Sequence, residues 1–524
     1  MNEITEKDKN KQLISGGKRM NLKTYFVTHF GGFWRWVESI PWLRRKVNRF
    51  LINSAIARTA TRPYPFTTLG PYTSWESLTD RTYSSRHLPA VDQPPNLPDT
   101  SELAELFMRR GETIPCPKST VLFAYFAQWF TDGFLRTDAH NPGKNTSNHE
   151  IDLTPFYGIN RTITEIVRAH RGGLLKSQMI NGEEYPPHLC ENGVVKTEFA
   201  GLKQVEFGKR KPEEKNQFFA MAGDRSNVQI GYVMLNVLFL REHNRIAGLL
   251  AREYPAWDDE RLFQTTRNIV IVILMRIVIE EYINHITPLE FPFFMDPGAF
   301  PNERWYRQNW MAVEFTLVYR WHMLIPDQLI LAGKSVNSFA TLWNTSMITD
   351  RGLGALFEDA SRQPAGKVGL FNSPRFLHDI EARSIQMGRD LRLASYNDYR
   401  ATYQFPRITD FSEISSNQTV QSELKRLYGD VDRIDYYIGL FAEDTVPNSV
   451  LPPLIGTLVA IDAFSQALTN PLLNPNIYHE RTFSPLGMEL IEKTGRLTDV
   501  LHRNIPADSR KYYVSLTRED WKRV

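Results

Sequence analysis

Long stretches of helical hydrophobic periodicity constrain this chain more than any other feature of its sequence. Apolar residues recur at three- and four-residue steps, the spacing that places them on one face of an α-helix. These stretches are residues 102–111, 118–136, 226–253, 258–286 and 307–321. Strand-like alternation is scarce, and the best candidate is a small hairpin over 174–185 around the turn Asn181-Gly182. We therefore predict a mostly α-helical fold.

The composition excludes two broad classes of protein. The 524 residues include 62 Lys and Arg against 59 Asp and Glu, which gives a formal net charge of +3. This charge is too small to favour nucleic acid as a partner. The two cysteines, Cys116 and Cys190, are too few for a disulfide-framed secreted domain. We expect an intracellular protein that binds no nucleic acid.

The chain shows no targeting or membrane-spanning signal. Residues 1–20 are polar and charged throughout, so they lack the apolar core of a secretory signal peptide. The longest aliphatic run, residues 269–275, ends at Arg276, whereas a transmembrane helix needs about 20 apolar residues. We expect no signal peptide and no transmembrane helix.

Residues 22–56 combine aromatic and basic side chains in one short stretch. Trp34, Trp36 and Trp42 are interleaved with arginines, and Pro41 divides the stretch into short helices. Short helices of this kind suit the headgroup region of a membrane, although a helical hairpin packed on the rest of the protein would show the same pattern. We favour the membrane, because exposed tryptophan is costly unless something covers it. The predicted divisions are a disordered lead-in at 1–21, a monotopic membrane-binding motif at 22–60, a linker at 61–100 and the main domain at 101–524.

Among the 12 histidines, His322 is the most distinctive candidate for a metal ligand. It ends an aromatic predicted helix, and Tyr319 precedes it by three residues, which would place both on one helical face. A metal or haem on His322 would then lie beside Tyr319. On the residues alone, a core histidine and a core tyrosine with hydrogen-bond partners remain the simpler interpretation. No GxGxxG, GxxxxGK[ST], HExxH or GxSxG motif points to other chemistry.

Several further motifs follow one another along the chain. They are Phe126-Ala127-Gln128, Ile151-Asp152-Leu153 with Tyr157-Gly158, Tyr185-Pro186-Pro187, Leu240–Arg245, Glu314-Phe315 followed by Tyr319–His322 and Pro326-Asp327, and Leu427–Asp430. Their sequence and order resemble the cyclooxygenase-like branch of the animal haem peroxidase family, which includes prostaglandin synthases and fatty-acid α-dioxygenases. The similarity spans residues 24 to 480.

The resemblance implies a large helical haem-binding domain preceded by membrane-binding helices. It implies haem b, with His322 as the iron ligand, Trp321 at the cofactor and Tyr437 near the proximal histidine. A peroxide would oxidise the haem, the haem would oxidise Tyr319, and the tyrosyl radical would take hydrogen from a fatty acid or acyl lipid before O2 adds. The family also allows a homodimer.

Gln128 matches the distal glutamine of the family, but Asp132 stands where the family has its distal histidine. The imidazole moves a proton during peroxide cleavage, so its loss would slow that step by about 10²- to 10⁴-fold. A desolvated Asp132 could shuttle the same proton, or it could serve in an ion pair or at a helix end. We expect weak peroxidase activity with oxygenase chemistry retained.

The resemblance also implies a substrate channel, although apolar residues at helical spacing are core residues by default. The matching positions are Phe130, Phe134, Phe315, Val318, Phe464 and Ser465. The arginine that binds the substrate carboxylate in animal enzymes aligns near Ala55, so Arg58 or Arg62 could hold a carboxylate instead, or could extend a basic membrane face. Two alternatives to a lipid oxygenase stay open: a peroxidase that oxidises small donors, and a non-catalytic lipid- or haem-binding protein.

Overall fold

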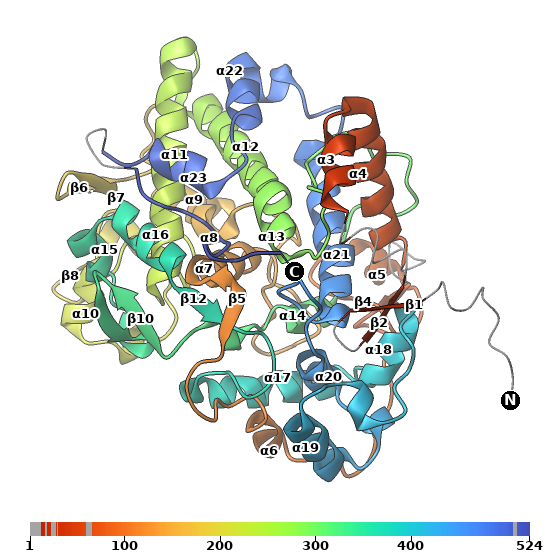
Figure 1. Ribbon diagram of the computed structural model, residues 1–524. Helices are drawn as coiled ribbons and strands as arrows, with labels where there is room; N and C mark the ends of the chain where they lie inside the picture. Colours follow the sequence, from red (N-terminus) through yellow and green to blue (C-terminus); the bar gives the residue numbers. More distant parts are fainter. Residues whose placement is uncertain are drawn as a thin grey trace, which may run out of the picture.

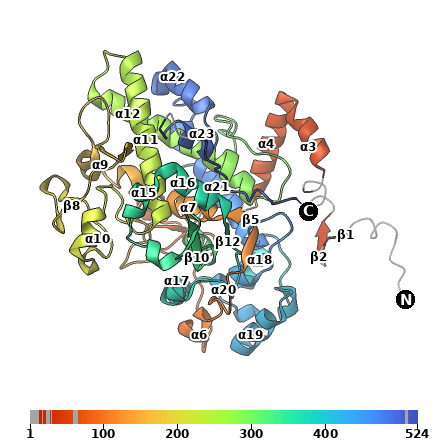
Figure 2. The ribbon, with the colours of Figure 1, turned by 60° about the vertical axis from the view of Figure 1, so that its left-hand side comes forward.

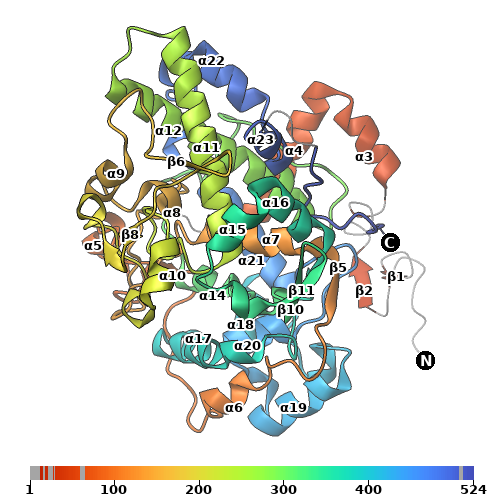
Figure 3. The same cartoon turned by 90° about the vertical axis from the view of Figure 1, so that its left-hand side faces the viewer.

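The computed structural model describes residues 12–15, 18–21, 28, 30–58, 65–506 and 511–523, and most of its regular structure is helical (Figure 1). Two long helices, α11 (Ile230–Glu253) and α12 (Asp259–Ile277), pack side by side. Shorter helices surround α7 (Val121–Thr131), which lies in the middle of the molecule in Figures 1 and 3. The predicted mostly α-helical fold is confirmed.

The remaining helices are short. They are α3 (Gly31–Glu38), α4 (Pro41–Ile56), α5 (Trp75–Thr79), α6 (Thr100–Ala104), α8 (Thr154–Tyr157), α9 (Arg161–Val167), α10 (Pro212–Gln217), α13 (Asn284–Ile286), α14 (Val313–Val318), α15 (Ser346–Arg351), α16 (Leu353–Arg362), α17 (His378–Asp390), α18 (Tyr396–Thr402), α19 (Gln418–Tyr428), α20 (Tyr436–Ala442), α21 (Pro453–Leu468), α22 (Glu480–Glu492) and α23 (Leu497–His502).

In the described part of the chain, strands form only two-stranded antiparallel pairs. They are β1 (Gln12–Ser15) with β2 (Lys18–Asn21), β3 (Phe66–Thr67) with β4 (Ser85–Arg86), β5 (Pro115–Thr120) with β12 (Pro364–Gly366), β6 (Gln178–Ile180) with β7 (Glu183–Tyr185), β8 (Cys190–Glu191) with β9 (Val194–Val195), and β10 (Gln328–Leu331) with β11 (Lys334–Asn337). The β6–β7 pair is the predicted hairpin. Its turn residues Asn181 and Gly182 have φ values of 52° and 82°, as a tight two-residue turn requires.

Helix α7 is almost entirely buried, because other elements surround it. Every residue of α7 except Gln128 is buried. The helix packs against α11 on one side and α16 on another, and β5 leads directly into it. A helix without a solvent face belongs in the core of a large domain, and α7 therefore fixes the positions of its neighbours.

The carboxy-terminal segment 511–523 completes the surroundings of α7. Its Leu516 carbonyl accepts a hydrogen bond from the Thr120 backbone N–H at 3.0 Å, and the Arg518 N–H donates to the Lys118 carbonyl at 2.8 Å. Thr517 also bonds the ring of His285 through its hydroxyl, at 2.7 Å. The segment thus fastens β5, and with β5 the start of α7, to the region where α12 and α13 end.

Four predicted helix ranges differ from the structure, and one of them, 307–321, holds only α14, Val313–Val318. The helix predicted at 102–111 is only α6, because residues 107–109 leave the helix and pair with the backbone of Ser373. The start of the range 118–136 is β5 rather than helix. The range 258–286 holds three consecutive helical pieces, since a π-helical turn, Val278–Ile283, lies between α12 and α13. Such turns shift the side-chain register of a helix by one residue and are frequent at functional sites.

The two amino-terminal helices stand at one edge of the molecule, as Figure 2 shows. Helix α4 packs along α21, and Trp34 of α3 contacts Phe291 edge-on at 6.0 Å between ring centroids. Within the described residues, no helix is long and apolar enough to cross a membrane. The lead-in expected at 1–21 lies outside the described residues apart from β1 and β2.

The contact of α7 with α11 at Gly231 gives a stability prediction. A Cβ atom at Gly231 would lie 2.0 Å from the Tyr125 ring, so Gly231→Ala forces the two helices apart. We expect this variant to lose about 1–3 kcal/mol of stability, the usual cost of overpacking. Gly248→Ala is the matched control, because it lies on the same helix and meets only the end of Arg252, at 3.7 Å. Thermal unfolding should show a clear loss for Gly231→Ala and no loss for Gly248→Ala; equal stability of the two would contradict this packing.

Candidate functional site

The ring of His322 is held by a buried carboxylate. His322 begins the short 3-10 helix η4 (His322–Leu324), and its Nδ1 lies 3.0 Å from Oε1 of Glu381, in the first turn of α17. The Tyr437 hydroxyl donates to Oε2 of Glu381 at 2.7 Å, and the Ser373 hydroxyl donates to Oε1 at 2.9 Å. Tyr437 therefore acts on His322 through Glu381.

The surroundings of His322 differ from those of the other buried histidines. His87, His149, His243 and His285 each have polar partners at both ring nitrogens. For His322, Nε2 has no polar partner among the described residues, and 23% of the side chain is exposed. A neutral imidazole that donates through Nδ1 keeps a lone pair on Nε2, which is the arrangement of a metal-binding histidine.

Charge and hydrogen bonds keep Glu381 ionised despite its burial. Burial by itself would raise the pKa of this carboxyl, but the neighbouring His322 ring and the donors His322, Tyr437 and Ser373 lower it overall. Glu381 therefore presents a negative charge to the imidazole.

Tyr319 and His322 do not share a helix, which corrects the predicted arrangement. Helix α14 ends at Val318, and Trp321 has a non-helical backbone before η4 begins. The Arg320 N–H closes the helix on the Leu317 carbonyl, and the chain then folds the Trp321 ring against Tyr319 with centroids 4.6 Å apart. The two residues lie close through this turn, not through helical spacing.

A second tyrosine lies beside Tyr319. Burial raises the pKa of Tyr282, on the π-helical turn, and the neighbouring Tyr319 hydroxyl raises it further. Burial raises the pKa of Tyr319, so its hydroxyl stays protonated at neutral pH. Tyr319 must therefore give up its proton if it gives up an electron.

Aromatic side chains connect Tyr319 to a small cavity. Its ring contacts Phe315 edge-on at 4.9 Å, Phe315 stacks on Phe134 at 6.4 Å, and Phe134 contacts Phe130 at 5.1 Å. Phe130 and Phe134 line a narrow apolar cavity that is too tight to hold a water molecule, together with Trp129, Ile151, Leu153 and Leu274 among others. Three of the predicted channel residues thus form one continuous apolar wall.

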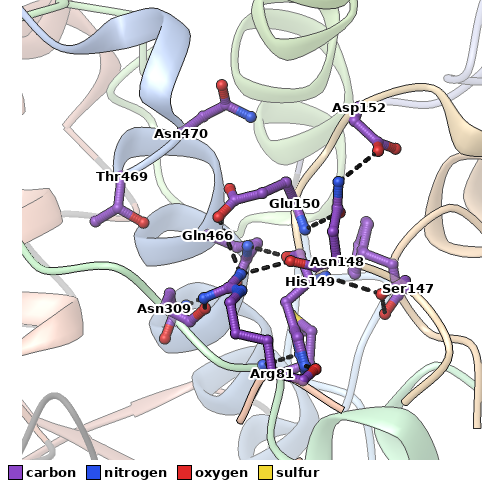
Figure 4. Close-up of polar contacts among 12 residues, drawn as sticks. Arg81, Ser147, Asn148, His149, Glu150, Asp152, Asn309, Gln466, Thr469 and Asn470 are labelled. Carbon is purple, nitrogen blue, oxygen red and sulfur yellow. Dashed lines mark hydrogen bonds and ion pairs between the residues drawn. The ribbon is translucent and has the colours of Figure 1, made fainter. Parts of the chain in front are cut away.

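The other predicted channel residues lie elsewhere on the same core. Val318 is fully buried, and Phe464 packs on Phe293 at 5.1 Å. The Ser465 hydroxyl donates to the Ile461 carbonyl at 2.7 Å and accepts from Asn309 at 3.4 Å. Asn309 belongs to the polar cluster beside α21 shown in Figure 4, where it also donates to Gln466 at 2.8 Å. These contacts place Ser465 at the edge of a polar cluster, and its role in a channel stays a prediction.

Gln128 is the one accessible residue of the otherwise buried α7. Its Oε1 accepts a hydrogen bond from Nε2 of Gln229 at 3.0 Å, and Gln229 caps the start of α11. An accessible amide on a helix in the middle of the molecule marks an opening in the core. Gln229, the residue that caps α11, thereby orients the Gln128 amide on α7.

Asp132, at the carboxy-terminal end of α7, is an ion-pair residue. It bonds the Arg225 guanidinium through Oδ1, and the Tyr232 hydroxyl donates to Oδ2 at 2.8 Å. Coulombic attraction to Asp132 is the main cause that raises the pKa of Arg225. Of the two roles expected for Asp132, these contacts favour the ion pair over the proton shuttle.

The charged groups around this region fit a haem. The Nε atom of Arg320 has no hydrogen-bond partner among the described residues. Burial lowers the pKa of Arg320 against the opposing effect of Tyr437 and Glu381, and nearby Arg225 lowers it further. Two guanidiniums close together suit a ligand with two carboxylates, and a haem carries two propionates. With the free Nε2 of His322, the donor set matches the cofactor.

Of the two residues predicted to bind a substrate carboxylate, Arg58 and Arg62, the structure describes Arg58. Arg58 donates to the Thr457 hydroxyl at 3.1 Å, and Thr457 lies on α21, the helix that carries Phe464 and Ser465. Burial lowers the pKa of Arg58. Arg62 lies outside the described residues.

Comparison with known proteins decides the family. The model of the animal haem peroxidase family matches residues 133–514, most of the chain. Prostaglandin G/H synthase 2 of Equus caballus is 33% identical over 500 residues, which cover 93% of this chain and 81% of the relative. The chain belongs to the animal haem peroxidase family. Prostaglandin G/H synthase 1 of Rattus norvegicus is 33% identical over 474 residues, which cover 88% of this chain and 76% of the relative.

Solved structures agree on the fold. Peroxidase A from Dictyostelium discoideum has a TM-score of 0.68 at 20% identity, covering 84% of this chain and 96% of its own. The fatty acid alpha-dioxygenase of Oryza sativa has a TM-score of 0.69 at 17% identity, covering 94% and 96%. At these identities the likeness shows the fold, and the relatives place the chain in the cyclooxygenase-like branch of the family, as an oxidoreductase. The family implies a bound haem.

Sequence reasoning missed three residues of the site. Glu381 is 59 positions from His322, and Arg225 is 93 positions from Asp132. Gln229 lies inside the predicted helical range 226–253, whereas in the structure it caps the start of α11. No local pattern separates Glu381 or Arg225 from the other charged residues, and only the fold brings them to their partners.

The ion pair of Asp132 gives a test that also separates its two expected roles. Asp132→Asn leaves Arg225 without its anion, and we expect a loss of about 1–3 kcal/mol, below the value for fully buried pairs because 49% of Arg225 is exposed. Glu303→Gln, which breaks the separate 2.7 Å pair with Arg49, should cost less, because the Glu303 side chain is 18% exposed against 7% for Asp132. Thermal unfolding and peroxide turnover are measured on both. A stable Asp132→Asn protein that has lost peroxide turnover would identify Asp132 as the proton shuttle.

Proposed function

We propose that this protein is a haem-dependent lipid oxygenase in which a radical on Tyr319 removes hydrogen from a fatty acyl chain, to which O2 then adds. The observation that carries the proposal is the position of Tyr319. On one side its ring stacks on Trp321, next to His322, and on the other it contacts the aromatic wall of an apolar cavity. This is the position that a residue needs to connect a redox cofactor with an apolar substrate.

The cofactor would be haem b, bound through iron at Nε2 of His322. Glu381 fixes the ring and its tautomer, while Arg320 and Arg225 would supply the positive charge for the haem propionates. The bound haem supplies the oxidising equivalent that Tyr319 needs, at the expense of a peroxide. Gln128, accessible on α7, would donate its amide hydrogen to the peroxide.

The protein's own residues control what Tyr319 does. Because burial raises its pKa, Tyr319 loses its proton together with an electron, and the neighbouring Tyr282 is the nearest phenol to influence that proton. Phe315, Phe134 and Phe130 exclude water from the path of the acyl chain. The exclusion of water protects a radical from side reactions.

A fatty acyl substrate is supported by two of the relatives, since prostaglandin synthases and a fatty acid alpha-dioxygenase share the sequence or the fold. Arg58 beside α21 is the described cation that could hold a substrate carboxylate. Peroxide activation would be weak, because Asp132 provides no imidazole and its charge is already paired with Arg225.

The helices α3 and α4 would dock on a membrane surface. Trp36 and Trp42 are 55% and 61% exposed, Phe50 is 58% exposed, and the cations Arg35 and Lys46 are exposed beside them. Aromatic rings with neighbouring cations suit the headgroup layer of anionic lipid. An acyl substrate could then enter from the bilayer, alongside α4 and α21.

Replacement of Tyr319 tests the oxygenase directly. Tyr319→Phe keeps the ring and its packing but removes the hydrogen that must leave, so O2 uptake with fatty acids should fall to background while haem absorbance is retained. Tyr185→Phe, a buried tyrosine on β7 bonded to Glu183, is the control. Uptake is measured with an oxygen electrode over a panel of fatty acids. Unchanged uptake in Tyr319→Phe would refute the radical role, and retained oxidation of a phenol by peroxide alone would indicate a small-donor peroxidase.

Membrane docking is tested with vesicles of phosphatidylcholine and phosphatidylserine. Trp36→Ala together with Trp42→Ala should weaken binding by roughly tenfold or more, from the apolar area lost at the headgroup layer. Trp75→Ala is the control, because Trp75 is 75% exposed but lies on α5, away from α3 and α4 in Figure 3. Co-sedimentation gives the affinities. If all three substitutions change binding equally, the docking surface is not α3 and α4.

A further inference from the structure

We propose that Glu381 makes His322 a strongly electron-donating ligand and thereby holds the bound iron in its ferric state, the state that reacts with peroxide. The proposal rests on the haem binding of the proposed function and adds a residue that sets the redox behaviour of the site. Glu381 does not touch the haem or substrate, so it is a positioning residue that acts through His322.

The hydrogen bond has only one chemically sensible direction. A carboxylate can only accept, so the proton between Oε1 of Glu381 and Nδ1 of His322, 3.0 Å apart, belongs to the imidazole. Nε2 is then the nitrogen with the free lone pair. The bond fixes both the tautomer and the plane of the ring.

No lysine or arginine among the described residues forms an ion pair with Glu381, although the Arg320 guanidinium is near enough for Glu381 to raise its pKa. Among the described residues, its ion-pair partner is the His322 ring, and its other partners are the neutral hydroxyls of Tyr437 and Ser373. Glu242 is a useful contrast, because that fully buried carboxylate is shared between Arg245 and Arg503. Glu381 therefore directs its charge at the imidazole.

A full negative charge on the Nδ1 proton draws that proton toward Glu381 and gives the ring some imidazolate character. An imidazolate donates more electron density to iron than a neutral imidazole does, and hydrogen bonds and charge around a proximal ligand set the potential of a haem. Ferric iron carries one more positive charge than ferrous iron, so the anion stabilises it preferentially. The midpoint potential of the one-electron couple falls.

The test uses the full-length protein loaded with haem. Glu381→Gln keeps the size of the side chain and an oxygen acceptor but removes the charge. We expect the ferric/ferrous equilibrium to shift toward ferrous by at least about tenfold, a positive shift of about 59 mV in the midpoint potential. The iron–histidine stretching band of the ferrous protein, measured by resonance Raman spectroscopy, should move to lower frequency. A purely structural role for Glu381 would move neither quantity.

Substitutions at two hydrogen-bond donors of Glu381 should shift the midpoint potential in the opposite direction. Tyr437→Phe or Ser373→Ala removes a donor from Glu381 and makes the carboxylate a stronger acceptor, so the midpoint potential should become more negative. Glu358→Gln is the control, because this buried carboxylate on α16 pairs with Arg362 and not with His322, and its potential should stay at the wild-type value.

Each outcome is decisive. A positive shift for Glu381→Gln with negative shifts for the partner variants supports the proposal. No shift in Glu381→Gln, or a shift equal to that of Glu358→Gln, overturns it while the proposed function stands. If Glu381→Gln does not fold, the partner variants decide through the presence or absence of their negative shift. A wild-type protein that takes up no haem overturns the proposed function, and this inference falls with it.

Discussion

The burial of α7 on all sides is the constraint on which the rest of the structure depends. An apolar helix with no solvent face needs partners in every direction, and α11, α16, β5 and the carboxy-terminal segment provide them. The close approach at Gly231 sets how deeply α11 lies against it. Because Gln128 and Asp132 stand at fixed places on this clamped helix, packing determines where one wall of the site lies.

Two carboxylates of the site, Asp132 at the end of α7 and Glu381 on α17, serve opposite purposes. Asp132 on α7 shares its charge with Arg225, so little of its field reaches beyond the pair. Glu381 on α17 forms no ion pair with a guanidinium in the described part of the chain, and its carboxylate bonds the His322 ring. The same functional group therefore serves as a structural counter-ion on one wall and as an electronic influence on the other, and the environment alone makes the difference. The Tyr319 ring stacks on Trp321, next to His322, and on its other side contacts Phe315 of the aromatic wall.

The sequence predicted the parts of this arrangement that depend on local pattern. Hydrophobic periodicity located α11 and α12, and Asn181-Gly182 located a hairpin. The motif around Tyr319 and His322 pointed to the right segment, but periodicity continued the helix through Trp321, because nothing local reveals that the Trp321 ring turns back onto Tyr319. Glu381 and Arg225 lay beyond reach for a different reason. Their partners are 59 and 93 positions away, and a single sequence contains no information on which distant charges will meet.

The fastening of β5 by the carboxy-terminal segment has a consequence for how the protein is made. Thr120 bonds Ser515, 395 positions later, just before the chain enters α7. Contacts this distant in sequence form late and slow the folding of a domain. On a ribosome, α7 is synthesised early but cannot receive its last support until nearly all the remaining chain has emerged, so its apolar surface needs protection during that time. A chaperone-dependent step in the biogenesis of the protein would follow from the placement of this one segment.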